Sequence, residues 1–231
     1  MSNNANIMLV HGAWADGSCW SKVILLLQAK GFTVTSAQIP LVSLENDIEV
    51  TRRLLSEQTE PTVLVGHSYG GAVITGAATE TPNVKALVYI TAFGLDEGES
   101  LESLAKQGPP SPGSTAIEPD AHGFLWINRE KFHDSFAGGA TADEAAVMAA
   151  VQKPLSFAAF GGKEGPPAWK TIPSWYLVCT EDQMIPPPAQ EFLSKRMNAT
   201  VRSVPSSHCP FVSHPQAVAD IIALAAESLN K

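Results

Sequence analysis

The stretch Thr62-Val63-Leu64-Val65-Gly66-His67-Ser68-Tyr69-Gly70-Gly71 decides the fold prediction. Its first four residues form a short apolar run that is typical of a buried strand, and a helical pattern follows the Gly-x-Ser-x-Gly motif directly. A sharp strand-to-helix turn at Ser68 needs glycines on both sides, because larger side chains would collide with neighbouring backbone. A plain structural turn would also fit the motif alone. Its position between strand and helix favours Ser68 as a nucleophile at the carboxyl edge of a sheet.

Strand and helix patterns alternate on both sides of this stretch. Short apolar or β-branched runs predict strands at 7–10, 32–35, 62–65, 85–93, 174–179 and 200–204. Helical spacing predicts a first helix with Ser18 as its cap and Gly31 as its stop, and further helices at 43–58, 72–79, 188–197 and 215–229. This alternation predicts an α/β fold: a mostly parallel sheet of about six strands with helices on both faces.

The helix predicted at 43–58 has an amphipathic pattern. Leu44, Ile48, Thr51 and Leu55 fall on one face, which we expect to pack on the core. Asp47 falls with other charged residues on the opposite side, so we expect it to contact solvent.

The alternation lapses between residues 94 and 171. This segment holds Gly/Pro-rich stretches at 108–113 and 161–167 around a helical pattern near 141–152. We therefore predict a core formed by residues 1–93 and 172–231, and a cap insertion at 94–171 that sits over the sheet.

Composition excludes several classes of function. Of 231 residues, 15 are Lys or Arg and 23 are Asp or Glu, and the resulting charge of -8 repels phosphate backbones and anionic membranes. The three cysteines Cys19, Cys179 and Cys209 are widely spaced, without a C-x-x-C pair, so neither a disulfide framework nor a structural zinc site is indicated. The sequence shows no signal peptide and no apolar run long enough to span a bilayer. We predict a soluble, cytoplasmic protein.

A serine nucleophile needs a positioned base, and His208 is the best candidate. His208 follows the last predicted strand, and therefore lies at the same sheet edge as Ser68. The other histidines lie in the first turn, inside the motif, in the insertion, or at the start of the last helix: His11, His67, His122, His133 and His214.

The base needs a carboxylate, which should follow a strand as well. Asp182 comes after the predicted strand 174–179, and the order Ser68, Asp182, His208 is the one expected for a nucleophile on a strand-to-helix turn of this kind. The rivals are its neighbour Glu181 and Asp96, which follows the preceding strand. We favour Asp182.

Acyl transfer also needs N–H donors for an oxyanion. The backbone N–H of Tyr69, after the nucleophile and at a helix N-terminus, is one candidate. The N–H of Ala13 is the other, since Gly12 lets the loop after the first strand turn its amides inward. His11-Gly12 alone would fit a simple turn, but the serine motif favours the oxyanion hole.

With these residues, the chain resembles the α/β-hydrolase superfamily. Within that superfamily it resembles the branch of plant methylesterases, hydroxynitrile lyases and bacterial esterases. The resemblance rests on five segments that together cover nearly the whole chain: 10–14 with Trp20, 65–71, 89–93, 181–186 and 207–208. It implies the six-stranded sheet, the cap inserted after the strand that ends near Phe93, and the Ser-His-Asp triad. It implies no metal and no organic cofactor.

The resemblance also bears on the reaction. The lyases carry a threonine and a lysine where Gly12 and Cys209 stand here, so an esterase is favoured over cyanohydrin cleavage. A small neutral ester, aryl ester or lactone is the expected substrate, with Trp14 and Trp126 as candidate binding residues, each of which would also serve in packing. We expect a small-molecule partner, no nucleic acid and no membrane, and a homodimer as a further prediction. A lyase-like activity and a non-catalytic ligand receptor are the alternatives.

Overall fold

A sheet of six parallel strands runs through the middle of the molecule. The computed structural model describes residues 5–230. The strand order is β2-β1-β3-β4-β8-β9, and every pairing is parallel. The strands are β1 (Asn6–Val10), β2 (Thr33–Ala37), β3 (Thr62–Ser68), β4 (Val84–Ala92), β8 (Ser174–Cys179) and β9 (Thr200–Val204). The predicted fold class and strand number are confirmed.

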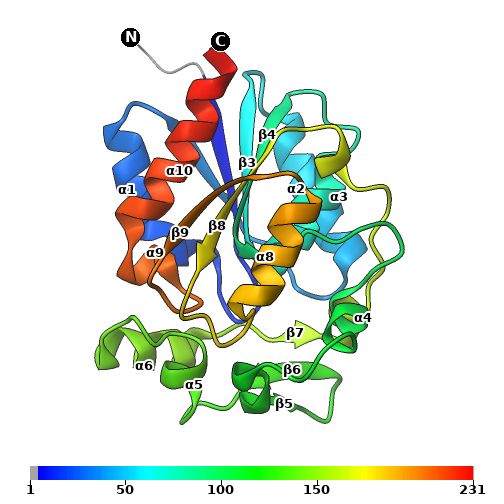
Figure 1. The fold of residues 1–231 in the computed structure, drawn as a ribbon, viewed down its shortest axis with the longest axis vertical. Coiled ribbons are helices and arrows are strands. Elements are labelled where there is room, and N and C mark those ends of the chain that lie inside the picture. Colours follow the sequence, from blue (N-terminus) through cyan, green and yellow to red (C-terminus); the bar gives the residue numbers. More distant parts are fainter. Residues whose placement is uncertain (1–4, 231) are drawn as a thin grey trace.

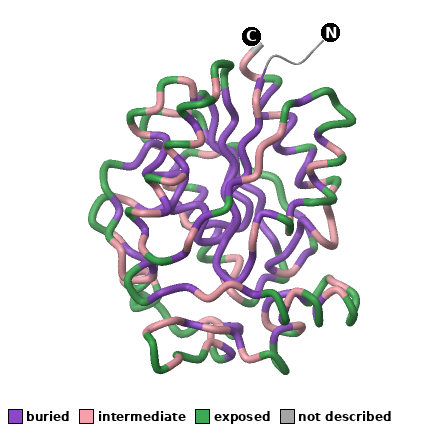
Figure 2. Tube along the Cα trace, turned by 180° about the vertical axis from the view of Figure 1, so that it is seen from behind, coloured by how far each residue is buried: buried purple, intermediate pink, exposed green. Residues whose placement is uncertain are grey.

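Helices cover both faces of this sheet. They are α1 (Ser21–Ala29), α2 (Leu44–Ser56), α3 (Tyr69–Ala77), α8 (Pro187–Arg196), α9 (Pro210–Ser213) and α10 (Pro215–Glu227), which is followed by the 3-10 turn η4 (Ser228–Asn230). Helices α1 and α10 pack against each other on one face, and α2 and α3 pack against each other on the other (Figure 1). The inward-facing residues of strands and helices form one continuous core, and the strands in the centre of Figure 2 are mostly buried.

The first helix begins later than predicted. Residues Gly17–Trp20 form a 3-10 turn, η1, whose cap is the Asp16 side chain, which accepts the Ser18 N–H at 2.7 Å. Helix α1 therefore starts at Ser21, and Ser18 is not its cap. Gly31 follows the helix with φ +85, a left-handed conformation that glycine adopts without strain, as expected of a stop.

Asp47 on α2 contradicts the amphipathic prediction, because it is fully buried. Its Oδ2 accepts the Tyr69 hydroxyl at 2.6 Å, and its Oδ1 accepts the Leu41 N–H at 2.8 Å. These two donors replace water, which is why a carboxyl group is tolerated at the border between α2 and the rest of the core.

The segment 94–171, which we call the insertion, contributes no strand to the main sheet. Its elements are α4 (Leu101–Ala105), η2 (Pro112–Ala116), β5 (Ile117–Pro119), β6 (Phe124–Ile127), α5 (Phe132–Ser135), α6 (Ala142–Val151), β7 (Leu155–Ser156), α7 (Phe157–Phe160) and η3 (Ala168–Lys170). Strands β5, β6 and β7 form a small antiparallel sheet that the sequence did not predict, because strands of two to four residues are too short to show alternation.

Part of the insertion, β5–β7, α5 and α6, forms a separate layer at the carboxyl end of the main sheet (Figure 1), whereas its last turn, η3, lies beside the amino end of β8. Its role as a cap stays a prediction.

Among the helices of residues 5–230, none combines the length and the apolar character that a membrane crossing requires.

Candidate active site

Strand β3 runs on to Ser68, and helix α3 begins at the next residue. Ser68 has φ 52 and ψ −122, a conformation that costs about 1–3 kcal/mol in a non-glycine residue and is held by its surroundings. A Cβ on Gly66 would lie 2.5 Å from the Gly70 carbonyl oxygen, and one on Gly70 would lie 2.6 Å from that of Val10. The predicted steric reason for both glycines is therefore confirmed.

The structure brings Ser68, His208 and Asp182 together in one chain of hydrogen bonds. The Ser68 hydroxyl lies 2.8 Å from His208 Nε2, and His208 Nδ1 lies 2.7 Å from Asp182 Oδ2. Since Asp182 can only accept, His208 carries its proton on Nδ1 and offers the bare Nε2 to the serine. All three residues are buried.

The rival carboxylates take no part in this chain. Glu181 is exposed, and its backbone N–H donates to the Ser206 carbonyl at 3.0 Å. Asp96 forms an ion pair with Lys170, which holds the pKa of its carboxyl below the ordinary value.

The other histidines have different tasks. His67 Nε2 donates to the backbone carbonyl of His208 at 2.7 Å, and burial lowers the pKa of His67 well below its ordinary value, so the ring stays neutral. The hydrogen bond from His67 fixes the loop that carries His208. No pattern in the sequence predicts this contact. His214 precedes α10 as its N-cap, as predicted, while His122 and His133 lie in the insertion.

The loop after β1 lies directly against Ser68. A Cβ on Gly12 would be 2.8 Å from the Ser68 Cβ, so only glycine fits there. The Trp14 N–H donates to the Lys153 carbonyl of the insertion at 2.9 Å. The N–H groups of Ala13 and Tyr69, in contrast, donate to no acceptor within residues 5–230. Two N–H groups beside the serine are thus free to bind an oxygen.

His11 determines which way this loop faces. Its Nε2 accepts the Ile39 N–H at 3.2 Å, so its proton lies on Nδ1, which donates to the Gly12 carbonyl at 2.8 Å. The Gly12 C=O and the Ala13 N–H belong to one trans peptide and therefore point in opposite directions. Burial lowers the pKa of His11 to about 4, so it does this as a neutral ring.

Aromatic residues of the insertion approach the triad. The Phe136 ring meets the His208 ring edge to face, with centroids 5.1 Å apart, and also packs on Trp14. The two predicted substrate residues are held by hydrogen bonds: the indole N–H of Trp14 donates to the Leu125 carbonyl at 2.8 Å, and that of Trp126 to Asp120 at 3.0 Å. Their role in substrate binding stays a prediction.

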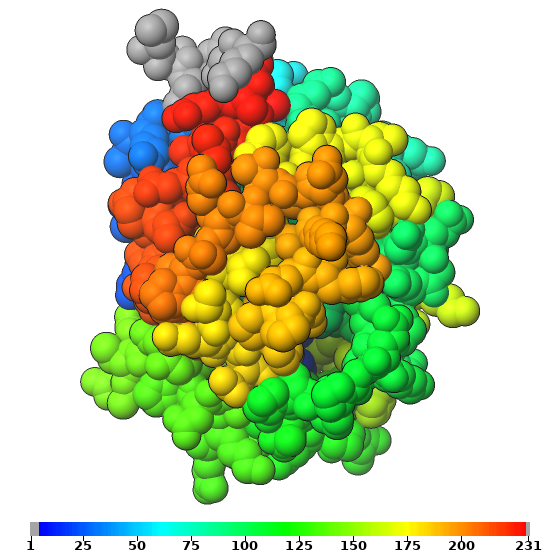
Figure 3. Space-filling model, viewed as in Figure 1, coloured from blue at the N-terminus to red at the C-terminus, as the bar shows by residue number. Residues whose placement is uncertain are grey.

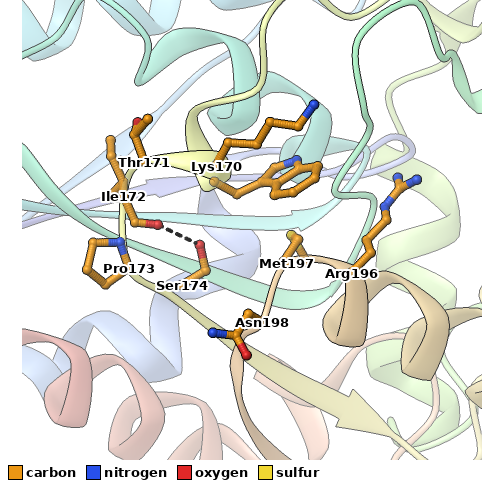
Figure 4. Close-up of a pocket in the computed structure, with 9 residues that line it drawn as sticks. Lys170, Thr171, Ile172, Pro173, Ser174, Arg196, Met197 and Asn198 are labelled. Carbon is orange, nitrogen blue, oxygen red and sulfur yellow. Dashed lines mark hydrogen bonds between the residues drawn. The ribbon is translucent and has the colours of Figure 1, made fainter.

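Two surface pockets are not lined by any residue of the triad. One, of about 410 Å³, lies between η1, α6 and α9, with Trp14 and Phe211 in its wall. The other, of about 400 Å³, lies at the amino end of β8, beside Trp169, Lys170 and Arg196 (Figure 4). Asp182 follows the opposite end of that strand, and both cations are paired, Lys170 with Asp96 and Arg196 with Glu99. The second pocket is therefore separate from the candidate active site.

A hollow opens in the molecular surface near α8. Figure 3 shows it between the gold atoms on the side of α8 and the green atoms of the segment around α4, with dark blue atoms of the N-terminal part of the chain at its bottom.

Among residues 5–230, no cluster of three His, Cys, Asp or Glu side chains is arranged to hold a metal ion. Cys209 is buried, as predicted, and burial raises the pKa of its thiol.

Comparison with known proteins agrees with this geometry. The model of the alpha/beta hydrolase family matches residues 7–221. A pyrethroid hydrolase of Sphingobium wenxiniae is 28% identical over 243 residues, which cover 94% of this chain and 86% of the relative. A carbendazim hydrolyzing esterase of a Nocardioides species is 37% identical over 119 residues, about half of each chain, 46% and 49%.

A solved structure shows the same fold over almost the full chain. The crystal structure of a pyrethroid hydrolase from Sphingobium faniae JZ-2 has a TM-score of 0.84 and 26% identity, and the match covers 97% of this chain and 98% of that one. The chain belongs to the alpha/beta hydrolase family. Within that family it is an enzyme of the carboxylic ester hydrolase class, to which the esterase branch predicted from the sequence belongs.

Proposed function

We propose that the protein hydrolyses small neutral carboxylic esters, aryl esters and lactones included, through an acyl-enzyme on Ser68. The observation that carries this proposal is the unbroken hydrogen-bond chain from Ser68 through His208 to Asp182. A serine hydroxyl is a weak nucleophile at neutral pH, and a neutral imidazole at hydrogen-bond distance is the base that activates it.

The reaction follows from these positions. The Ser68 oxygen attacks the ester carbonyl carbon while its proton passes to His208 Nε2, and Asp182 stabilises the imidazolium. The N–H groups of Ala13 and Tyr69 bind the oxyanion. The tetrahedral intermediate then expels the alcohol, which takes the proton from Nε2. A water molecule, deprotonated by the same nitrogen, attacks the acyl group and releases the carboxylic acid.

The surroundings of the triad support an apolar substrate. Phe136 covers one side of the His208 ring, and Trp14 packs on Phe136. The hollow of Figure 3 is the route we assign to the ester, because the dark blue atoms at its bottom belong to the segment that includes β1 and the loop after it. The two named relatives, a pyrethroid hydrolase and a carbendazim hydrolyzing esterase, support a search among esters with aromatic groups.

The test is the initial rate on p-nitrophenyl esters of increasing acyl length. We expect Ser68→Ala and His208→Ala each to lower the rate about 1,000-fold or more while the fold remains intact. Ser203→Ala, at an exposed serine on β9, is the matched control and should keep the wild-type rate. Full activity in Ser68→Ala would overturn the proposal, and the acyl length at which the wild-type rate falls measures the acyl pocket.

A further inference from the structure

The carboxylate of Asp182 is held by more donors than His208 alone. Its Oδ1 accepts the N–H groups of Met184 at 2.7 Å and Ile185 at 3.0 Å. Its Oδ2 accepts His208 Nδ1–H and also the hydroxyl of Thr91, a residue of β4. Thr91 is fully buried, and its hydroxyl has no other hydrogen-bond partner among residues 5–230.

The backbone at Thr91 departs from a regular strand. Its φ is 39, in the left-handed region, which is unusual for a β-branched residue and costs about 1–3 kcal/mol. On β3, His67 pairs with Ile90 and Ser68 with Ala92, so Thr91 is an extra, unpaired residue of a bulge. Pairing with β8 ends at Ile90 as well. Bulges beside active sites commonly redirect a side chain.

Neighbouring residues lock this bulge in place. The Tyr176 hydroxyl accepts the Ala92 N–H at 3.0 Å and donates to the Ala92 carbonyl at 2.8 Å. The Phe93 N–H donates to the Ser68 carbonyl at 3.1 Å. The left-handed turns at Ser68 and Thr91 thus lie side by side at the ends of β3 and β4, one carrying the nucleophile and the other a donor to the acid.

We propose that Thr91 is a positioning residue of the triad: its hydroxyl fixes the rotation of the Asp182 carboxylate, so that Oδ2 stays aligned with His208 Nδ1–H. The proposal rests on the function proposed above. The Met184 and Ile185 N–H groups hold Oδ1, but without Thr91 only His208 and the long contact from Gln190 would hold Oδ2. The carboxylate could then tilt about Oδ1, and the imidazole would lose its orientation toward Ser68. Gln190 Nε2 is only a weak donor to Asp182 Oδ2, at 3.5 Å, because its N–H groups also donate to the carbonyls of Cys179 at 3.0 Å and Ile185 at 2.6 Å.

The test compares Thr91→Ser with Thr91→Ala, a pair that differs only in the hydroxyl. Thr91→Val, which keeps the branched shape without the hydroxyl, is the third variant and keeps the test valid if the smaller residues loosen the fold. We expect Thr91→Ser to keep kcat within about threefold of wild type, and Ala and Val to lower kcat about 10- to 100-fold, the value of a hydrogen bond to a charged group, with little change in KM.

A second measurement does not depend on turnover. We expect the proton on His208 Nδ1 to give a downfield NMR resonance, which should shift or broaden in Thr91→Ala and Thr91→Val and return in Thr91→Ser. Equal kcat and equal spectra in the Ser, Ala and Val variants would overturn the positioning role. Failure of the proposed function is seen separately, as activity that survives in Ser68→Ala with Thr91 intact.

Discussion

Asp182 and Glu164 are both carboxyl groups in the interior, 2% and 3% exposed, yet their surroundings differ sharply. Asp182 accepts hydrogen bonds from two backbone N–H groups, from Thr91 and from His208. Glu164, in the insertion, makes no well-formed hydrogen bond through either carboxyl oxygen within the described residues. The amide of Gly165 and the charge of Arg52 favour its ionised form, but burial outweighs both and raises its pKa to about 8.

The difference shows what makes a buried carboxylate usable in catalysis. Burial alone favours the neutral acid, because a desolvated charge is costly. Donors aimed at both oxygens compensate that cost and keep the anion in one orientation. The carboxyl ends of β4 and β8 supply such donors around Asp182, whereas the loop at Glu164 supplies almost none, so Glu164 is protonated at neutral pH.

The largest expected effect comes from Asp182→Asn. The amide would present N–H groups to His208 and favour the wrong imidazole tautomer, so we expect kcat to fall by about 1,000- to 10,000-fold. Initial rates on the best p-nitrophenyl ester measure this. Glu181→Gln, at the exposed neighbour, is the matched control and should retain the wild-type rate. A loss smaller than tenfold in Asp182→Asn would mean that its donors hold a structural group only.

The next effect concerns stability and its pH dependence at Glu164. In the folded state Glu164 keeps its proton up to about pH 8, whereas the unfolded chain loses it near the ordinary value of 4.5. Between these values the folded state binds more protons, so stability falls as pH rises, by about 4 kcal/mol from pH 4.5 to pH 8. Glu164→Gln does not titrate. We therefore expect it to resemble wild type near pH 4.5 and to be the more stable protein at pH 8.

Urea unfolding at a series of pH values checks this difference. Glu130→Gln, at an exposed glutamate of the insertion, controls for the change of net charge. Parallel stability curves for wild type and Glu164→Gln would contradict the view that Glu164 is a protonated acid. Ester hydrolysis at neutral pH should be unchanged in this variant, because Glu164 takes no part in the hydrogen-bond chain of the triad.

Local patterns predicted the sheet well, since each long strand is an apolar or β-branched run and each strand end marks one edge. The serine motif, placement at strand ends and the order along the chain together selected Ser68, Asp182 and His208, which the structure joins by hydrogen bonds. The short strands β5–β7 were not predicted, because they form by pairing between separate segments of the insertion and show no strand pattern of their own.

Residues that depend on distant partners could not be predicted in the same way. The sequence around Thr91 predicts an ordinary strand residue. No local pattern predicts the bulge or the contact of Thr91 with Asp182, which is 91 positions away. The helical pattern placed Asp47 in solvent for the same reason, since its partners are Tyr69 and the loop at Leu41. Polar residues in the interior are specified by tertiary partners, which periodicity does not encode.

Asp47 is intermediate between the two carboxyl groups compared above, and it gives the smallest predicted effect. It has two donors, yet burial still raises its pKa above the ordinary value, more than the Tyr69 and Leu41 hydrogen bonds lower it. A double-mutant cycle with Asp47→Ala and Tyr69→Phe isolates the hydroxyl contact. We expect a coupling energy of about 1–2 kcal/mol in urea unfolding, the range for a buried hydrogen bond to a carboxyl group. Each single variant should change kcat only a few-fold, because the N–H that we propose for the oxyanion belongs to the Tyr69 backbone and not to its side chain. Additive effects of the two substitutions would show that Asp47 is held by Leu41 alone, and that one donor suffices to keep a carboxyl group in this interior.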